Sequence, residues 1–324
     1  MVLSFLELVD GNIKKSSLEA VQYASGFASK SGVQTIAVAL GTANAGQLEL
    51  ACKYGADKII NDDSEIFSAF DNNTFAEAIT NLASKLQATT IILSHTYTGK
   101  AIAPRLAVKW NASIVSGVVD NPQGDGTLLL KKGVFSGKAF AHVNVASERK
   151  IIALTPNSFN LAENQKPVNI EKTNLEINPT IPALTIKEQV KASGSIPLTE
   201  AEVVVSGGRG LKGPENWGMI EELAGILGAA TACSKPVSDM HWRPHSEHVG
   251  QTGITIKPNL YIAVGISGAI QHLAGISSSK VIVAINKDPE APFFKIADYG
   301  IVGDAFEVLP KVIDSAKKIK SSQQ

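Results

Sequence analysis

The chain has 324 residues, of which 44% are hydrophobic and 19% charged, and its formal net charge at pH 7 is zero. Without a basic stripe the chain lacks the electrostatic attraction that nucleic acids and anionic membranes require, so no nucleic acid is expected as a partner. No apolar run reaches the ~18 residues of a membrane-spanning helix, so no membrane insertion is expected. This length predicts two domains with separate cores.

The N-terminal segment Met1–Asp10 contains two acidic residues and no basic flank. It predicts neither a secretory signal nor a transit peptide. Cys52 and Cys233 lie far apart in the sequence and are interpreted as buried thiols rather than a disulfide. These features predict a cytoplasmic location.

Residues 1–120 alternate between strand-like and helix-like segments, which predicts a parallel sheet with helices on both faces. The predicted strands are Leu3–Val9, Thr35–Ala39, Lys58–Ile60, Thr90–Ser94 and Ser113–Val118. The predicted helices are Leu18–Ala28, Gly46–Lys53, Thr74–Leu86 and Ala101–Lys109. The Thr98-Gly-Lys100 turn is compatible with a nucleotide contact or with a plain helix cap.

The next segment changes character. Gly124–Leu130, Lys138–Val145 and Ile151–Leu154 predict antiparallel strands that complete the first sheet. Glu171–Ser195 is polar, contains two prolines and lacks periodicity, so it predicts a hinge. The predicted α/β architecture is therefore an N-terminal Rossmann-like domain at residues 1–190 and a C-terminal doubly wound parallel-sheet domain at residues 191–324.

The second domain begins with a predicted strand, Glu202–Val205, followed by Gly208-x-Gly210-x-x-Gly213 and a predicted helix, Glu215–Leu227. This spacing is that of a dinucleotide fingerprint. The fingerprint also requires an acidic residue at the end of the next strand to hold a ribose, and that strand ends in Ser234-Lys235. The missing acid argues against an NAD-dependent dehydrogenase.

A continuous apolar run, Leu260–Ile266, predicts a strand that is buried on both faces. Small residues break the run, and a helix is predicted over Ala269–Ala274, with Ser267 as a potential cap. This arrangement suits a phosphate at the helix N-terminus, although a plain strand-to-helix crossover has the same pattern.

The polar segment 236–248 contains three histidines, at positions 241, 245 and 248. Because no cysteine or acidic residue completes a convincing ligand set, a solvated loop is preferred over a metal site. No nucleophile–base pair or pair of catalytic carboxylates stands out, so no catalytic residue is predicted.

The ends of the predicted strands line one edge of the second sheet, where parallel sheets bind ligands. These ends carry Arg209, Ser234, Ser267–His272, Asn286 and Asp304. The pattern predicts a ligand site along this edge.

Four blocks of the second domain resemble the alpha subunit of electron transfer flavoproteins, in the order and spacing of that family. They are Gly250–Gly253, Pro258–Gly275, Ala284–Pro292 and Ala297–Asp304. The resemblance is strong over residues 203–312 and looser over residues 1–190.

The resemblance implies one FAD, bound by the second domain. On this basis Arg209 contacts the FAD, the Ser267–His272 turn holds the pyrophosphate and ribityl chain, and Thr252 hydrogen-bonds flavin N5. His272 lies near flavin O2, where a proton or positive charge stabilises the reduced flavin. The full set of expected FAD-binding residues is Arg209, Ser234, Lys235, Val249, Gly250, Gln251, Thr252, Ser267, Gly268, Ala269, Ile270, Gln271, His272, Asn286 and Asp304.

The chain departs from the family at Lys235, because the family usually has an arginine there, against the flavin ring. Lysine keeps the charge and loses the planar fork. Arg243, in the nearby loop, is a candidate to compensate.

The resemblance also implies an electron carrier rather than an enzyme with its own substrate. The family forms a heterodimer with a beta subunit that holds AMP, and the first domain packs on that subunit. It accepts electrons from acyl-CoA and other flavin dehydrogenases, as in fatty acid beta-oxidation, and passes them to a membrane quinone oxidoreductase. Two alternatives are an electron-bifurcating flavoprotein subunit, which oxidises NADH with a second FAD in the partner, and an NAD-dependent dehydrogenase.

Overall fold

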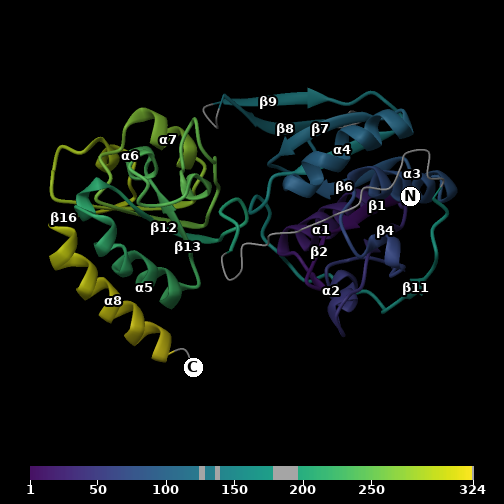
Figure 1. Cartoon of the computed structure of the whole chain (residues 1–324). Helices are drawn as coiled ribbons and strands as arrows, with labels where there is room; N and C mark the ends of the chain where they lie inside the picture. Colours follow the sequence, from purple (N-terminus) through teal and green to yellow (C-terminus); the bar gives the residue numbers. More distant parts are fainter. Residues whose placement is uncertain (124–127, 136–138, 178–195, 323–324) are drawn as a thin grey trace. The chain divides into compact units, whose positions relative to one another are not determined.

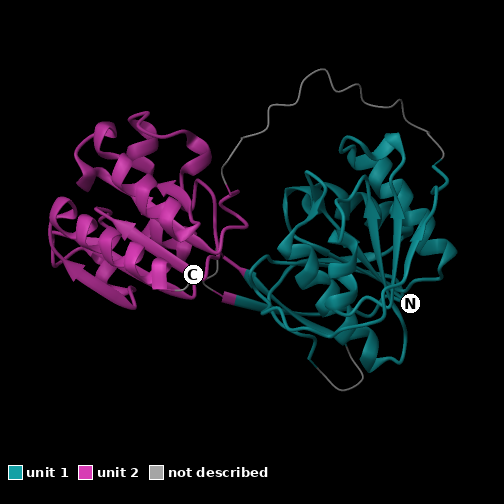
Figure 2. Cartoon of the chain, turned by 90° about the horizontal axis from the view of Figure 1, so that it is seen from below, with its two compact units in different colours: residues 1–133, 140–191 teal, residues 134–139, 192–324 magenta. Residues whose placement is uncertain are grey.

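The computed structural model describes residues 1–123, 128–135, 139–177 and 196–322. The chain divides into two compact units, one of residues 1–133 and 140–191 and one of residues 134–139 and 192–324 (Figure 2). Each unit is built around its own sheet. The predicted α/β class with two parallel sheets is confirmed.

In the described part of the first unit, nine strands form one sheet in the order β11-β5-β4-β1-β6-β10-β7-β8-β9. The strands are β1 (Val2–Leu6), β4 (Thr35–Leu40), β5 (Lys58–Asp62), β6 (Thr90–Ser94), β7 (Ser113–Val118), β8 (Leu129–Val134), β9 (Ala139–Asn144), β10 (Lys150–Leu154) and β11 (Ile170–Lys172). The helices are α1 (Lys15–Lys30), α2 (Gln47–Lys53), α3 (Asn72–Lys85) and α4 (Tyr97–Trp110), with a 3-10 turn η1 at Glu65–Phe67. Helices α3 and α4 pack against each other (Figure 1).

Two predictions for this unit are wrong, and a third begins at the wrong residue. The first strand ends at Leu6, because Asp10 and Gly11 adopt positive φ and turn β2 (Leu8–Val9) back onto β3 (Asn12–Ile13). Strand β10 is parallel to β6 and β7, not antiparallel, and its nearly continuous burial is typical of a central parallel strand. The segment predicted as a hinge begins inside β11, which pairs with β5.

Parts of the predictions for residues 124–195 lie outside the described residues. The predicted strand Gly124–Leu130 lies mostly outside the described residues, and so do Lys138 and the stretch 178–195 of the predicted hinge. Strand β8 runs antiparallel to β7, as predicted for this region.

The second unit has an all-parallel sheet in the order β13-β12-β14-β15-β16. Its strands are β12 (Val203–Gly207), β13 (Ala230–Cys233), β14 (Leu260–Val264), β15 (Val281–Asn286) and β16 (Tyr299–Val302). Its helices are α5 (Gly218–Leu227), α6 (Lys235–Asp239), α7 (Ile270–Ile276) and α8 (Ala305–Ser322). Short 3-10 turns are η2 (Arg209–Leu211), η3 (Pro214–Asn216), η4 (His245–Glu247) and η5 (Pro292–Lys295).

Helices cover both faces of this sheet, with α5 and α8 on one side and α7 on the other (Figure 1). Strand β14 therefore contributes Tyr261 and Ala263 to one core cluster and Ile262 and Val264 to the other. Burial on both faces explains its unbroken apolar sequence. No helix of the described residues is long and apolar enough to cross a membrane.

Candidate functional site

The strand ends of the second sheet form one row. The register places Gly207 opposite Cys233 and Val264, and Val264 opposite Ile285. The loops that follow these strands therefore start side by side, from Gly208 after β12 to the residues after Asn286 at the end of β15. The chain order reverses between β12 and β14, and such a switch point opens a crevice at the carboxyl ends of the strands.

At this switch point the loops after β12 and β14 touch backbone to backbone. The amides of Gly208 and Gly210 donate to the carbonyls of Val264 (2.9 Å) and Gly265 (3.0 Å). A Cβ on Gly210 would lie 2.6 Å from the Cα of Gly265, so both positions need glycine. Because these amides are already used, the Gly208–Gly213 spacing reflects close packing and not a pyrophosphate cradle, which removes the basis for an NAD-dependent dehydrogenase.

The turn after β14 keeps its amides available. Within the described residues, no backbone carbonyl accepts from the N–H groups of Gly268, Ala269 or Ile270. Gly268 has a φ of +86° and a Cβ there would lie 2.5 Å from the Phe293 nitrogen, so the turn lies directly on η5. Helix α7 begins after Ala269 and has no side-chain cap, so the predicted capping role of Ser267 is wrong. Ser267, Ala269, Ile270 and Gln271 are exposed.

The loop Val249–Thr252 is docked against α7. The Gln251 amide donates to the Gln271 carbonyl (2.7 Å), and a Cβ on Gly275 would lie 2.6 Å from the Cα of Gly250. Val249 and Gly250 are buried and support the loop, whereas Gln251 and Thr252 are exposed at its tip. The structure thus brings Thr252 and the first turn of α7 together, as the prediction of a shared site requires.

His272 is buried, with 6% of its surface exposed. Its Nε2 lies 2.8 Å from the hydroxyl of Tyr261. Burial and the neighbouring His248 lower the pKa of His272 to about 4, against the influence of the Val249 carbonyl. The imidazole is therefore neutral at pH 7, so this protein without ligand offers a hydrogen-bonding group at position 272 and not the positive charge that the sequence allowed.

Two exposed cations lie at the strand ends. Arg209 begins η2 after β12, and Lys235 begins α6 after β13. Among the described residues, neither side chain has an ion-pair partner. Both charges are available to a ligand.

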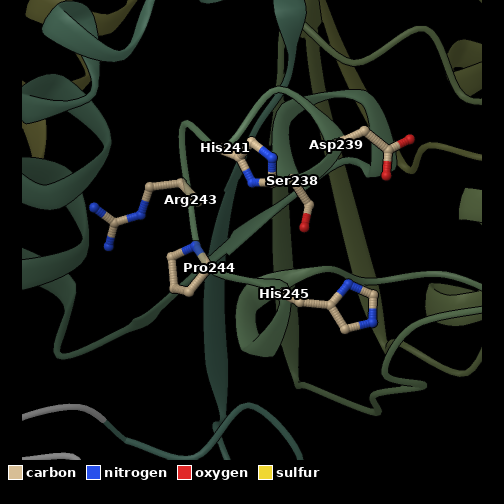
Figure 3. Close-up of a pocket in the computed structure, with 6 residues that line it drawn as sticks. All are labelled: Ser238, Asp239, His241, Arg243, Pro244 and His245. Atoms are coloured by element: carbon tan, nitrogen blue, oxygen red, sulfur yellow. The ribbon is translucent and has the colours of Figure 1, made fainter.

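Arg243 is not available in this way. Its guanidinium binds both carboxylate oxygens of Glu247 (2.9 and 2.6 Å) and Glu221 (2.8 Å), and lies 5.5 Å from the Trp217 ring centroid. Figure 3 shows its side chain extending away from His245. The structure therefore does not support Arg243 as a substitute for the family's flavin-facing arginine.

Asn286 and Asp304 have roles within the fold. The Asn286 side chain donates to the Ile266 carbonyl (2.9 Å) and accepts from the Asp288 amide (3.0 Å), which ties β15 to the turn after β14. Asp304 accepts from the Phe306 amide (2.9 Å) at the start of α8 and lies 3.7 Å from the Lys212 nitrogen. The amide of Phe306 lowers the pKa of Asp304. Their contact with a cofactor remains a prediction.

The histidine loop forms an open cleft of about 400 Å³, lined by Ser238, Asp239, His241, Arg243, Pro244 and His245 (Figure 3). His241 and His245 are exposed, whereas His248 is buried. Among the described residues, no group of three or more histidine, cysteine or acidic side chains is placed to hold a metal ion.

In the first unit, Thr98-Gly-Lys100 lies in the first turn of α4. The Gly99 amide donates to the Thr96 hydroxyl (3.0 Å), which makes this turn a helix cap. Ser234 is buried at the end of β13, where its amide continues the strand pairing to the Gly207 carbonyl.

Tyr261, whose hydroxyl contacts His272, was not among the predicted site residues. The signal was present, because Tyr261 is the one residue with a polar side-chain atom in the run Leu260–Ile266. A buried phenol normally finds a hydrogen-bond partner, so its isolation in an apolar run indicated a polar neighbour across the core.

The residues at this edge fit an extended dinucleotide cofactor. Four strand spacings span roughly 19 Å, and along them lie unused amides, two exposed cations and the Thr252 hydroxyl. An anion suits the amides of a turn that leads into a helix.

Comparison with known proteins identifies the family of this chain. The electron transfer flavoprotein domain family matches residues 2–178, and the electron transfer flavoprotein FAD-binding domain family matches residues 197–277. The chain is 36% identical over 315 residues to an electron transfer flavoprotein subunit alpha of Syntrophomonas wolfei, covering 97% of this chain and 98% of that one. It is 35% identical to the Bacillus subtilis subunit alpha, covering 97% and 96%. It is 30% identical to the lactate dehydrogenase (NAD(+),ferredoxin) subunit LctC of Acetobacterium woodii, covering 95% and 75%. The chain therefore belongs to the electron transfer flavoprotein alpha-subunit family and carries its FAD-binding domain.

Proposed function

We propose that this chain holds one FAD at the carboxyl edge of β12–β16. With a beta subunit, it would carry electrons from acyl-CoA and other flavin dehydrogenases to a membrane quinone oxidoreductase. Family membership gives the flavin and the general pairing with a beta subunit. The observation that supports the placement is the open switch point, where the amides of Gly268–Ile270 have no backbone acceptor. Bound FAD would supply the one- and two-electron chemistry, and the protein would supply orientation and charge.

The positions of the predicted residues support a role for each of them at the FAD, and His272 would lie near flavin O2. Gly268, Ala269 and Ile270 would hold the pyrophosphate with their amides, and Ser267 and Gln271 would complete this contact. Arg209 and Lys235 would add positive charge. Val249 and Gly250 would support the loop that presents Gln251 and Thr252 to the flavin ring, and Ser234 would help shape the floor.

The remaining predictions rest on the resemblance to the family alone. AMP in the partner subunit, packing of the first domain on that subunit, a role in beta-oxidation and a cytoplasmic location stay predictions. Asn286 and Asp304 would reach the adenosine end in addition to their contacts within the fold.

The test is to purify the chain together with its beta subunit and to identify the bound flavin by its absorption spectrum and by mass spectrometry after release. One FAD per heterodimer is expected, and acyl-CoA with its dehydrogenase should reduce it. Arg209→Met should weaken FAD binding, because it removes an exposed cation at the site. Lys318→Met, which removes an exposed cation on α8, should not. A colourless heterodimer, or equal effects of the two substitutions, would overturn the proposal.

The similarity to a lactate dehydrogenase (NAD(+),ferredoxin) subunit supports a second candidate, an electron-bifurcating complex. In that case the heterodimer would hold two FAD molecules and NADH would reduce it without a dehydrogenase. Flavin stoichiometry and a titration with NADH separate the two candidates.

A further inference from the structure

A buried pair of polar side chains lies beneath the candidate flavin site. The hydroxyl of Tyr261, on β14, is 2.8 Å from Nε2 of His272, on α7. Tyr261 is fully buried and 6% of His272 is exposed. A hydrogen bond in such surroundings is shielded from competition by water, so it can control the state of the imidazole.

The neighbouring rings hold the pair in place. Tyr261 and Phe293 are parallel to within 5°, with centroids 6.3 Å apart, and His272 lies 5.8 Å from the Phe293 centroid. The backbone of Phe293 is itself fixed, because its amide donates to the Ser267 carbonyl (3.2 Å). The imidazole therefore has little freedom to turn away from Tyr261.

Both partners are neutral at pH 7. Burial raises the pKa of Tyr261 and lowers that of His272. The nearby Cys233 thiol is also neutral, since burial and Glu247 raise its pKa to about 12. His248 is a second buried imidazole in this region, and burial and His245 lower its pKa as well.

A neutral imidazole has one N–H and one lone pair, so the Tyr261 hydrogen bond allows two arrangements. Either the phenol donates to Nε2 and the proton of the ring is on Nδ1, or Nε2–H donates to the phenol oxygen. If Nε2 carried the proton, the phenol hydrogen would lose this acceptor inside the core, so donation from the phenol to Nε2 is favoured. Nδ1 is buried and has no hydrogen-bond partner among the described residues, so it is the ring nitrogen left to hold the proton.

We infer that Tyr261 is a positioning residue for the flavin site: its hydroxyl donates to His272 Nε2 and so keeps Nδ1, which has no partner among the described residues, protonated as a hydrogen-bond donor for the flavin. This inference rests on the proposed FAD site. A neutral donor stabilises the negative charge of reduced flavin by a hydrogen bond, without adding a full charge of its own. Tyr261 would act only through His272 and would not touch the cofactor.

The test compares Tyr261→Phe with Tyr23→Phe. Both substitutions remove a buried phenol hydroxyl from beside an aromatic ring, but Tyr23 lies in the first unit against Phe159. Histidine-labelled heterodimers are studied by long-range ¹H–¹⁵N correlation spectra, which separate protonated from unprotonated ring nitrogens, and His272→Gln assigns the signals. The potential of bound flavin is measured on the same samples.

In the parent protein, Nδ1 of His272 should be protonated and Nε2 should not. Tyr261→Phe should shift the ratio of the two tautomers roughly 2- to 10-fold, the effect of one neutral hydrogen bond. The flavin potential should fall by no more than the ~60 mV that a tenfold change represents. Tyr23→Phe should change neither quantity, and in a His272→Gln background Tyr261→Phe should leave the potential unchanged.

Protonated Nε2 in the parent protein would overturn the inference, and so would unchanged His272 signals in Tyr261→Phe. A parent heterodimer without FAD would instead refute the proposed function. The tautomer could still be measured on such a protein, so the two failures are distinguishable.

Discussion

Each unit has a switch point between parallel strands, and this point is closed by side chains in the first unit and open in the second. In the first unit the switch point lies between β1 and β6, and its own side chains close it. There the Thr96 hydroxyl donates to a carboxylate oxygen of Glu7, and Lys14 lies 3.3 Å from the other oxygen. The Ser94 hydroxyl donates to the Ser16 carbonyl (2.6 Å). Glu7, Thr96, Ser94 and Ser16 are all buried.

In the second unit the corresponding edge carries glycines, unused amides and exposed polar side chains. The two edges differ in a few residues that follow the strands. The parallel strands that carry these residues reverse their chain order at a switch point in both units. The comparison shows that an α/β sheet supplies the place for a ligand, and that the strand-end residues decide whether the place is open.

The largest expected effect comes from separating the two glycine loops that meet at the open edge. Gly265 has a φ of +62° and a Cβ there would lie 2.8 Å from the Gly210 Cα. Gly265→Ala should therefore separate the loops after β12 and β14, and most of the FAD should be lost. Gly228→Ala is the matched control, since Gly228 has a φ of +61° with no atom within 4 Å of the added Cβ.

The control variant should lose only about 1–2 kcal/mol of stability, the cost of a left-handed residue, and should keep its flavin. FAD content per heterodimer and the midpoint of urea unfolding measure both. If the two variants lose flavin equally, loop contact at Gly265 is not what keeps the site in shape.

The next effect concerns the closed edge. Glu7→Gln removes a buried charge that accepts from Thr96 and pairs with Lys14, and should destabilise the first unit by about 3 kcal/mol, the lower end for broken buried pairs. Asp63→Asn, at the exposed pair with Lys172 in the same unit, should have little effect. Hydrogen exchange, read on peptides of each unit, should show faster opening of the first unit only. Faster exchange in the second unit would contradict the prediction. So would an unchanged free energy of unfolding of the Glu7→Gln protein without FAD.

Local patterns predicted most of the fold. Continuous apolar runs located β4, β6 and β14, and the strand-end residues of the second sheet were placed on one edge. The direction of β10 was not predictable in this way, because it depends on pairing with β6 across some 60 residues, where loop-closure cost gives no local signal. The Asp10-Gly11 turn, by contrast, has a local signal, because this dipeptide is typical of a hairpin turn.

The sequence also did not predict which of the two edges is closed by its own side chains and which is open. Thr96 and Glu7 are 89 residues apart, and only the fold brings them into contact. Arg243 likewise meets Glu221 across 22 residues, which leaves its charge neutralised rather than free. Sequence reasoning can name the residues at a strand end but not which of them already have partners.

Acid pH offers a smaller test of the comparison, because each unit holds histidines with a lowered pKa, His95 in the first and His248 and His272 in the second. Burial, with Lys100 and Lys132, lowers the pKa of His95 to about 4, as burial and His248 do for His272. Unfolded histidine binds its proton near pH 6.5, so the unfolded state binds more protons than the folded state between pH 6.5 and 4. Stability is therefore full above about pH 6.5 and falls as the pH decreases to about 4.

The loss should reach about 2–3 kcal/mol for His272 and less for His95, which is partly exposed. His95→Gln should remove this acid sensitivity from the first unit, and His272→Gln should reduce it in the second, where His248 keeps its own contribution. Hydrogen exchange of each unit at pH 7 and pH 5 measures the difference. Equal stability of the parent protein at both pH values would show that these side chains are not held neutral.

The smallest effect tests which cation at the open edge acts on the flavin. Lys235 is exposed and has no ion-pair partner among the described residues, whereas Arg243 is bound by Glu221 and Glu247. A cation near the ring stabilises the negative charge that reduction adds. Lys235→Met should therefore lower the first reduction potential of bound FAD by about 60 mV, which corresponds to one pKa unit or ~1.4 kcal/mol, a low value because solvent screens an exposed charge.

Lys235→Arg should change this potential much less, since it keeps the charge and alters only the shape of the group. Lys212→Met is the matched control, because it removes another exposed lysine from the same edge, one that lies 3.7 Å from Asp304. Spectroelectrochemical titration of the heterodimers separates two explanations. A decrease in Lys235→Met alone assigns the effect to the position after β13. An equal decrease in Lys212→Met would mean that the net charge of the unit sets the potential, and the lysine at the family's arginine position would then have no special role.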